Sequence, residues 1–377
     1  MPTRRNFLRW SAAAAALAAI PVTDLATRAT ATAATTLPLT VVNDTGRFAD
    51  TAIWFYVVGI NPAGQQVYVR ADGTPVVVTP SLNGPDGFAD LSIPLGTTVN
   101  LPQMSGRIYF SINDKLKFKV VGANALQYPA GWVSTDPSFN VLHDWVEFTL
   151  NPSGMFCNTT MVDMFGVPLA IHLAGASQQT TGTLVAGGRT AIMNGIAAQP
   201  GFGQLVLANG LRVIAPGHGI DAGLFSPTYY DAYVNQVWST YTATNLNVTV
   251  NGTTLAGRVS GGSLVFAGGG GTFAKPTTQD IFYCAGALAP PAGTAGPVAA
   301  VLGAAFNRST LLSSAQQPVN DAAAFYQNAT TNHYARIIHQ NTVDGKAYGF
   351  PFDDVSGFAA FVSDGAPTSV TVTLTPF

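Results

Sequence analysis

The sequence predicts a mainly β protein of the α+β class, in which a mixed α/β domain is inserted into a β-sandwich or β-barrel. Three observations along the 377 residues support this fold class. From residue 37 to about residue 165, short runs of β-branched and aromatic residues alternate with turn residues, as is typical of a sandwich or barrel. Helical stretches mixed with short strands follow Pro168. A last β-branched run, residues 368–374, most simply rejoins the first sheet.

These observations divide the chain into four parts. We expect a signal peptide at residues 1–34 and the first part of the β-domain at residues 35–167. We expect the inserted α/β domain at residues 168–340 and the return to the β-domain at residues 341–377.

The first part of the chain is an export signal rather than part of the fold. Residues 3–9 contain a twin-arginine signature, and an apolar run follows at residues 12–20. This run is too short to span a bilayer, which argues against a transmembrane anchor. The small residues Ala31 and Ala33 suit a signal peptidase, so the mature chain should begin near Ala34 and be secreted.

Four runs in the first part of the β-domain have the composition of strands. They are residues 39–43, 52–58, 66–69 and 107–111. Turn residues, such as the Asn-Gly-Pro-Asp-Gly of residues 83–87, separate such runs.

The insert combines helices and strands. Residues 188–198 and 227–242 have helical patterns, and the second has Ser226 at the N-cap and Pro227 at the first helical position. Further helices are expected at residues 277–287, 297–312 and 321–326, and strands at residues 205–207, 212–214 and 246–250.

The composition indicates the class of partner. Charged residues make up only 10% of the chain, the net charge is −2, and no basic block follows the signal peptide. Nucleic acid and anionic membranes need clustered Lys and Arg, so neither is an expected partner. A neutral polymer fits this surface best, and we expect the chain to act as a monomer.

Glu147 is the only glutamate among the 19 acidic residues. It lies in a predicted strand, residues 142–151, whose side chains alternate between two faces. One face is apolar except for Asp144. The other face is polar with one aromatic residue, which suits a sugar-binding surface; it carries His143, Trp145, Glu147, Thr149 and Asn151.

A second carboxylate is expected beside Glu147. If residues 158–165 form the partner strand of a hairpin centred near Met155, then Asp163 lies directly opposite Glu147. Opposed side chains have Cβ atoms about 5 Å apart, and like charges there are destabilising unless they have a function. Two carboxylates are what glycoside hydrolysis needs, and a separation of roughly 6.5–9.5 Å is the inverting range. The alternative is a solvated face with an incidental pair of acids.

Several other residues are candidates for functional or structural roles. Cys157 and Cys284 are expected to form a disulfide in an oxidising compartment, with two buried free thiols as the alternative. His143 is expected at the surface and Asp144 in a turn cap. The remaining histidines show no metal-ligand spacing, Gly217-His218-Gly219 is expected to be a turn, and Asp353-Asp354 is expected to cap a turn. No cofactor is expected.

The hairpin also resembles a known family. Two motifs, HDWVEFT at residues 143–149 and MVDMFG at residues 161–166, are similar to the catalytic region of glycoside hydrolase family 64. The members of this family are secreted β-1,3-glucanases of actinobacteria and relatives, and they release laminaripentaose. The resemblance extends over residues 37–377 and includes YYDAYV at residues 229–234 and YGFPFDDVSG at residues 348–357. The last motif also resembles the C-terminal end of thaumatin-like proteins.

The resemblance implies a fold, a mechanism and site residues. It implies a thaumatin-like β-domain and an α/β domain that flank a wide groove for β-1,3-glucan. It implies an inverting mechanism with Glu147 as general acid and Asp163 as general base. It further implies glucan contacts, which would be made by Thr149, Asn151, Thr160 and Phe156, the last at the position of an aromatic sugar platform. Trp145 could stack on a glucose ring or pack in the protein.

The function predicted from these observations is a secreted, inverting endo-β-1,3-glucanase. It would act on laminarin, curdlan or fungal wall glucan and release laminaripentaose. Two alternatives stay open. One is a non-catalytic β-glucan-binding or antifungal thaumatin-like protein, and the other is a glycosidase for another polymer, such as a β-1,4-glucan.

Overall fold

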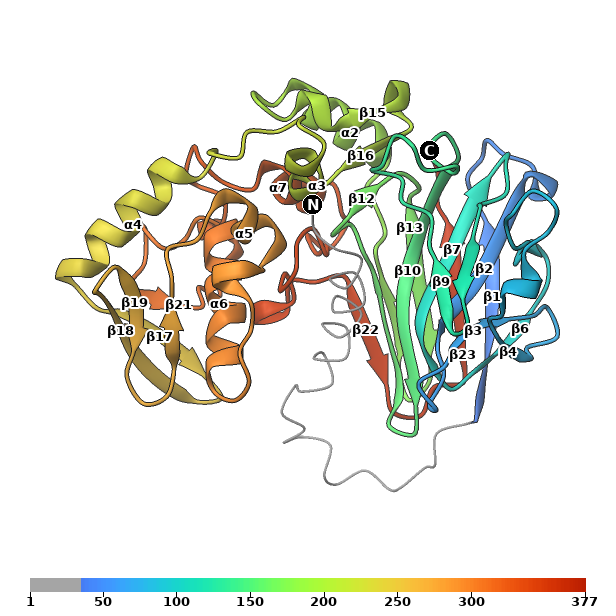
Figure 1. The fold of residues 1–377 in the computed structure, drawn as a ribbon, viewed down its shortest axis with the longest axis horizontal. Helices are drawn as coiled ribbons and strands as arrows, with labels where there is room; N and C mark the ends of the chain where they lie inside the picture. Colours follow the sequence, from blue (N-terminus) through green and yellow to red (C-terminus); the bar gives the residue numbers. More distant parts are fainter. Residues whose placement is uncertain (1–34) are drawn as a thin grey trace.

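The computed structural model describes residues 35–377, so the predicted signal peptide at residues 1–34 lies outside the described residues. The described chain is mostly β with some helices, and it forms two lobes (Figure 1). Both chain ends of the β-rich lobe lie in one sheet, where strand β23 (Ser369–Leu374) pairs in parallel with β1 (Thr36–Asn43). In residues 35–377, no helix has the length and apolarity needed to cross a membrane.

The β-rich lobe is a sandwich of two sheets. The first sheet has the order β14-β13-β23-β1-β6. Its strands not yet given are β6 (Val99–Pro102), β13 (Leu169–Ala174) and β14 (Gln178–Thr181). β1 shows why these sequences form strands, because alternate residues such as Leu37 and Leu39 are buried while their neighbours are exposed.

The second sheet has eight strands and carries the candidate site. The order is β22-β11-β10-β7-β2-β3-β4, with β5 paired to β2. The strands are β2 (Ile53–Ile60), β3 (Gln66–Val69), β4 (Pro75–Val77), β5 (Ile93–Pro94), β7 (Met104–Ile112), β10 (Leu142–Asn151), β11 (Gly154–Thr159) and β22 (Phe361–Asp364). A hydrophobic core fills the space between the two sheets. A separate two-stranded ribbon, β8 (Lys119–Gly122) and β9 (Ala125–Gln127), flanks this sheet.

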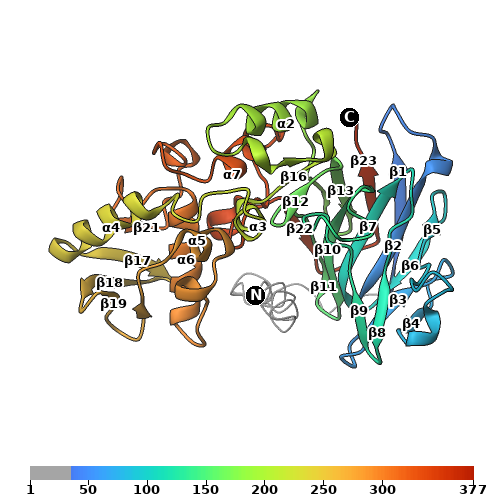
Figure 2. The same cartoon turned by 45° about the horizontal axis from the view of Figure 1, so that its top comes forward.

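The second lobe contains two small sheets and the helices. One sheet is β12 (Met164–Phe165), β16 (Arg212–Ile214) and β15 (Val206–Leu207). The other has the order β20-β19-β18-β17-β21, made by β17 (Leu246–Val250), β18 (Thr253–Ser260), β19 (Ser263–Phe266), β20 (Gly271–Phe273) and β21 (Gln316–Gln317). The helices are α2 (Gly188–Ala198), α3 (Pro216–Asp221), α4 (Asp231–Ala243), α5 (Thr278–Tyr283), α6 (Ala295–Asn307) and α7 (His333–Gln340). Figure 2 shows α3 between the sandwich and the rest of this lobe.

The elements predicted in the insert are confirmed in part. The helix at residues 188–198 and the strands at residues 212–214 and 246–250 have the predicted bounds. The helix predicted from Pro227 begins only at Asp231. The reason is that residues 226–230 form a turn, in which the Ser226 hydroxyl accepts from the Thr228 amide and the Tyr230 amide donates to Thr278.

Three further helix predictions change at their ends. The helix predicted at residues 297–312 spans Ala295–Asn307. The helix predicted at residues 277–287 ends at Tyr283, because Cys284 adopts a left-handed conformation with φ of 45°. Its start is well defined, since Thr277 and Asp280 form a capping box. The helix predicted at residues 321–326 is a single 3₁₀ turn, Ala322–Ala324, capped by Asp321. Helices α3 and α7 were not predicted.

The predicted disulfide is wrong. Cys157 and Cys284 are both free and buried. Cys157 points into the core of the sandwich, whereas Cys284 packs in the second lobe with Phe350 and two alanines. Each sulfur therefore fills a different hydrophobic cluster, and the Cys284 thiol donates to the Pro351 carbonyl at 3.0 Å.

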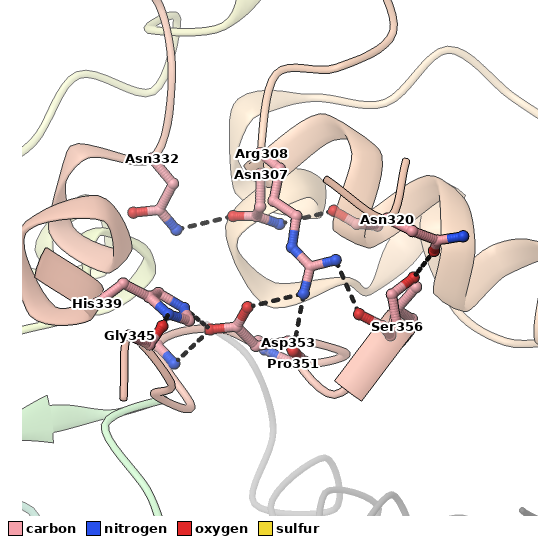
Figure 3. A network of polar contacts seen from close by, with 12 residues as sticks. Asn307, Arg308, Asn320, Asn332, His339, Gly345, Pro351, Asp353 and Ser356 are labelled. Atoms are coloured by element: carbon pink, nitrogen blue, oxygen red, sulfur yellow. Dashed lines mark hydrogen bonds and ion pairs between the residues drawn. The ribbon is translucent and has the colours of Figure 1, made fainter. Parts of the chain in front are cut away.

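A buried ion-pair network fixes the closing segment, residues 348–357, to the second lobe (Figure 3). Asp353 is fully buried and accepts from Arg308 at 3.1 Å and from the ring of His339 at 2.8 Å. It also accepts from the Gly349 amide at 2.9 Å, as a turn-capping aspartate does. Arg308 extends from the end of α6 and His339 from α7, so one carboxylate joins two helices to the last segment before β22.

Candidate active site

The hairpin that carries Glu147 has a different register from the predicted one. β10 pairs with β11 so that Glu147 lies opposite Asn158, not opposite Asp163. The turn is tight, at Pro152-Ser153, and is not centred on Met155. Gly154 allows this, because a Cβ atom there would lie 2.1 Å from the Asp364 carbonyl of β22, and its φ is 124°. The predicted direct opposition of the two carboxylates is therefore wrong.

Arg107 nevertheless brings the two carboxylates together. It lies on β7 directly opposite Glu147 in the sheet. Its Nη2 atom is 3.0 Å from Glu147 Oε1 and 3.7 Å from Asp163 Oδ2. Its Nε atom also donates to Glu147 Oε1 at 3.1 Å. Glu147 and Asp163 thus approach one guanidinium group from different parts of the chain, Glu147 from a strand and Asp163 from the loop between β11 and β12.

The guanidinium rests on buried aromatic rings. It lies 4.9 Å from the centroid of the Trp145 ring, and its Nη1 donates to the Tyr109 hydroxyl at 3.3 Å. Burial alone would lower the pKa of Arg107, but the charges of Tyr109, Glu147 and Asp163 raise it above its ordinary value. Arg107 therefore stays charged between the two acids.

The suggested role of Trp145 in stacking on a sugar ring is wrong. Its side chain is 1% exposed and packs against Tyr109 and Trp132, with ring centroids 5.2 and 6.3 Å away. The prediction that Trp145 lies on the same face of β10 as Glu147 is confirmed. The ring is covered because loops and the second lobe pack over this end of the sheet, where Trp145 joins their hydrophobic core.

Two neighbours of Trp145 are also buried. His143, expected at the surface, is fully buried, and burial together with the nearby Arg212 charge lowers its pKa to about 3. Asp144 accepts from the amides of Gly166 and Val167 at 2.8 and 3.2 Å. Burial raises the pKa of Asp144 to about 7. Asp144 therefore fixes the turn after β12, close to its expected capping role.

Helix α3 holds Asp163 at two points. The Ala215 amide, directly before the helix, donates to the Asp163 carbonyl at 2.9 Å. The Nε2 atom of His218 lies 2.8 Å from Asp163 Oδ1. Burial would raise the pKa of Asp163, but the hydrogen bond and charge of His218, followed by the charge of Arg107, lower it below its ordinary value.

The loop that carries Asp163 is anchored to the second lobe through its backbone. The Met161 amide donates to the Tyr348 carbonyl at 2.8 Å. The Tyr334 hydroxyl on α7 donates to the Met161 carbonyl at 2.6 Å. Thr160, in the same loop, is 4% exposed. The position of Asp163 consequently depends on the second lobe and on the closing segment as well as on the sheet.

A strip of half-buried residues, which we call the polar strip, continues from Glu147 along the sheet. It consists of Thr149 and Asn151 on β10, Ser105 on β7 and Phe156 on β11. Thr149 lies between Ser105 and Phe156 in the sheet register, and its hydroxyl is 2.8 Å from that of Ser105. Three of the predicted glucan contacts thus share one partly exposed surface with Glu147.

Arg107, His218, Tyr283 and Asp221 were not predicted as site residues. The Gly217-His218-Gly219 motif, interpreted as a turn, is the middle of α3. Its glycines allow close packing, because a Cβ atom at Gly217 would lie 2.8 Å from the Tyr283 ring. A histidine between two glycines after a proline is a weak signal, and nothing in the sequence connects it with Asp163. Among residues 35–377, no group of three His, Cys, Asp or Glu side chains is placed to hold a metal ion.

Comparison with known proteins gives consistent results. A family model described as beta-1,3-glucanase, glycoside hydrolase family 64, matches residues 35–374. A model of the twin-arginine translocation pathway signal sequence matches residues 1–21. Glucan endo-1,3-beta-glucosidases from Arthrobacter sp. (strain YCWD3) and Cellulosimicrobium cellulans are each 36% identical over 398 residues, which cover 99% of this chain and 72% of theirs.

Two solved structures are similar in fold. One is a laminaripentaose-producing beta-1,3-glucanase in complex with laminaritetraose, with a TM-score of 0.84 and 38% identity over 91% of this chain and 99% of that chain. The other is a beta-1,3-glucanase domain from Clostridium beijerinckii, with a TM-score of 0.82 and 26% identity over 91% of this chain and 98% of that one.

Proposed function

The chain belongs to glycoside hydrolase family 64, the β-1,3-glucanases, and on this premise we propose that Glu147 and Asp163 are its catalytic acid and base. The protein is an endo-acting glycoside hydrolase that cleaves β-1,3-glucan, and its twin-arginine signal directs export from the cell. The observation that supports the two residues most strongly is their shared contact with the Arg107 guanidinium, at 3.0 and 3.7 Å, beside a partly exposed polar strip.

Enzymes of this family invert the configuration at the anomeric carbon. In the proposed reaction Glu147 donates a proton to the glycosidic oxygen, while Asp163 accepts a proton from the water that attacks the opposite face of the sugar. Both contacts of Arg107 with Glu147 use Oε1. No group within residues 35–377 hydrogen-bonds to Oε2, which is therefore the oxygen placed to carry the proton.

The glucan is proposed to lie along the polar strip. Thr149 and Asn151 would contact hydroxyl groups and Phe156 would offer an aromatic face. The expected glucan contact of Thr160 is not part of the proposal, because this residue is buried. Side chains on adjacent strands suit an extended polymer, because successive exposed residues on a strand are about 7 Å apart. Trp145 is not included, because it is buried under Arg107.

The finer features of the fold and the product are part of the same proposal. The sandwich would be a thaumatin-like β-domain, and the chain from about residue 168 to residue 340 an inserted domain that forms the other wall of a wide groove. Related proteins are described as laminaripentaose-producing, so we propose a five-sugar product and a single chain as the working unit.

The test is product release from laminarin and curdlan, with the anomeric configuration followed by NMR. The wild type should release oligosaccharide that appears first as the α-anomer. Glu147→Gln and Asp163→Asn should each lower kcat by about 10²-fold or more, because each removes one proton transfer. A wild type that binds glucan without cutting it would overturn the proposal and leave a glucan-binding protein. Turnover of β-1,4-glucan at a similar rate would overturn the assigned linkage.

A further inference from the structure

A chain of hydrogen bonds runs from Asp163 to the surface of the second lobe. His218 Nε2 is 2.8 Å from Asp163 Oδ1, and His218 Nδ1 is 3.0 Å from the Tyr283 hydroxyl. That hydroxyl donates to Asp221 Oδ2 at 2.6 Å. The other oxygen of Asp221 accepts from Gln279 at 2.7 Å. This series of hydrogen bonds begins at the largely buried carboxylate of Asp163 and ends at the exposed carboxylate of Asp221.

The protons shared along this series of hydrogen bonds can be counted. A tyrosine hydroxyl has one proton, and Tyr283 donates it to Asp221. The same oxygen can only accept from His218, so His218 Nδ1 carries a proton. At Nε2 an unprotonated nitrogen would face a carboxylate oxygen 2.8 Å away, and the two lone pairs would repel. A second proton must therefore lie between His218 and Asp163.

The surroundings place this second proton on His218. Arg107 lies 3.7 Å from the other oxygen of Asp163 and favours the ionised carboxylate. The Trp132 ring stacks on the imidazole with centroids 4.3 Å apart and an interplanar angle of 18°, an arrangement that favours a cation. Burial, followed by the hydrogen bond and charge of Asp221, raises the pKa of Tyr283 above its ordinary value, so Tyr283 keeps its own proton.

We propose that His218 is a positioning residue for the catalytic base: held as an imidazolium between Asp163 and the Tyr283–Asp221 pair, it occupies Oδ1 of Asp163 and leaves Oδ2 to take the proton of the attacking water. This inference rests on the proposed role of Asp163. In the reaction the water oxygen bonds to the anomeric carbon, one water proton moves to Asp163 Oδ2, and the Glu147 proton moves to the leaving oxygen. His218 keeps both of its protons throughout.

This arrangement determines how activity depends on pH at the acidic side. An inverting base works only when ionised, so protonation of Asp163 produces the acidic limb of the pH profile. The positive charge of His218 favours ionised Asp163 and keeps that limb at low pH. Loss of the charge should move the limb to higher pH, whereas a purely structural contact would change the rate or the stability without moving the limb.

The experiment is the pH dependence of kcat/KM on laminarin for wild type, His218→Gln and Asp221→Asn. His218→Gln keeps a hydrogen-bond donor but removes the charge, so its acidic limb should rise by about 1–2 pH units with KM changed less than about threefold. Asp221→Asn keeps an acceptor for Tyr283 but removes a negative charge at the surface, so its limb should not rise and should shift by less than about half a unit to lower pH. Asp114→Asn, an exposed aspartate of the sandwich, is the control and should match wild type.

The protonation state is checked directly by ¹⁵N NMR of the histidine rings. The His218 signals, assigned by their loss in His218→Gln, should show both nitrogens protonated at neutral pH. In Tyr283→Phe the Nδ1 proton loses its acceptor, so the neutral ring with its proton on Nε2 should become populated. If His218→Gln fails to fold, as judged by circular dichroism, the NMR spectra of wild type and Tyr283→Phe decide whether His218 is charged.

Two results would overturn the inference. One is a wild-type His218 ring that is neutral at pH 7, and the other is an acidic limb that does not rise in folded His218→Gln. These results differ from a failure of the proposed function. If Asp163→Asn retains full activity, Asp163 is not the base; if Asp163→Asn is inactive and the profiles of the other variants overlay wild type, only the role of His218 is wrong.

Discussion

Arg107 lies between the two proposed catalytic carboxylates, and its replacement should reduce turnover more than binding. Arg107→Met removes the hydrogen bonds and charge that hold Glu147 and Asp163, so both side chains lose their positions. We expect kcat to fall by about 10²-fold, because small misplacements of catalytic groups cost that much. Arg107→Lys keeps the charge without the two-sided geometry and should lose about tenfold. Both are measured by kcat and KM on laminarin.

The matched control for Arg107 is Arg258, an exposed arginine on β18 that donates to the Ala243 carbonyl. Arg258→Met should leave kcat within about twofold of wild type, since exposed substitutions away from a site have small effects. Wild-type kcat in Arg107→Met would show that the guanidinium has no part in holding the carboxylates.

The two cysteines give a second prediction for single residues. Burial raises the pKa of the Cys157 thiol to about 12, and it also raises that of Cys284. Neither thiol should react with a thiol reagent such as DTNB in the native protein, because reaction needs an accessible thiolate. After unfolding in guanidinium chloride, both should react without prior reduction. A reductant should leave the melting temperature unchanged, and a lower melting temperature would indicate a bridge.

At the same scale, the sequence indicated the proposed catalytic pair more fully than the residues around it. The alternation of residues 142–151 placed Glu147, Thr149 and Asn151 on one face correctly. The same alternation could not show that Trp145 is covered, because the covering residues come from distant loops and from the second lobe. His218 was missed for a related reason, since its partner Asp163 lies 55 residues away.

At the scale of elements, the network of Arg308, Asp353 and His339 should make stability depend on pH. Burial would lower the pKa of His339, but the charge and hydrogen bond of Asp353 raise it above its ordinary value. A raised pKa in the folded state stabilises the protein at low pH, and this contribution is lost as the pH rises through the folded value. The part of the unfolding free energy that His339 supplies should therefore be present below the ordinary histidine pKa of about 6.5 and be lost as the pH rises through the higher value of the folded state.

Two variants separate the contributions to this pH effect, both measured by urea denaturation. His339→Gln should show a weaker fall over the same pH range, because it does not titrate. Asp353→Asn should be less stable at every pH by about 3–5 kcal/mol, because Arg308 is then a buried charge without its counter-ion. Identical pH slopes in wild type and His339→Gln would contradict the prediction.

The β10–β11 hairpin shows which element-level features the sequence could specify. The position of β10 followed from its alternation, but its register depended on whether the turn was centred at residue 155 or at Pro152-Ser153. The contact that decides between them is the approach of Gly154 to the Asp364 carbonyl, on a strand more than two hundred residues later. A local pattern carries no information on such a contact, so the strand was predictable and its pairing was not.

At the scale of the whole molecule, the site depends on contacts between the two lobes. The sandwich supplies Arg107, Glu147 and the polar strip. The second lobe supplies His218, and its helix α7 holds the Asp163 loop through the hydrogen bond from Tyr334 to the Met161 carbonyl at 2.6 Å. If Asp163 is the base, the second lobe is thus needed to position it, although Glu147 and Asp163 both belong to the part of the chain before this lobe.

Tyr334→Phe tests this dependence. The change leaves a buried carbonyl without its donor, which should cost about 1–3 kcal/mol of stability, and the loop should shift away from its best position for catalysis. Tyr241→Phe is the matched control, since the Tyr241 hydroxyl also donates to a buried backbone carbonyl, that of Leu311 at 2.6 Å, within the insert. Both variants should lose similar stability in thermal melts, but only Tyr334→Phe should lose kcat, by about tenfold or more. Equal kcat values in the two variants would show that the loop keeps its geometry without α7, and that the insert contributes to catalysis only through α3.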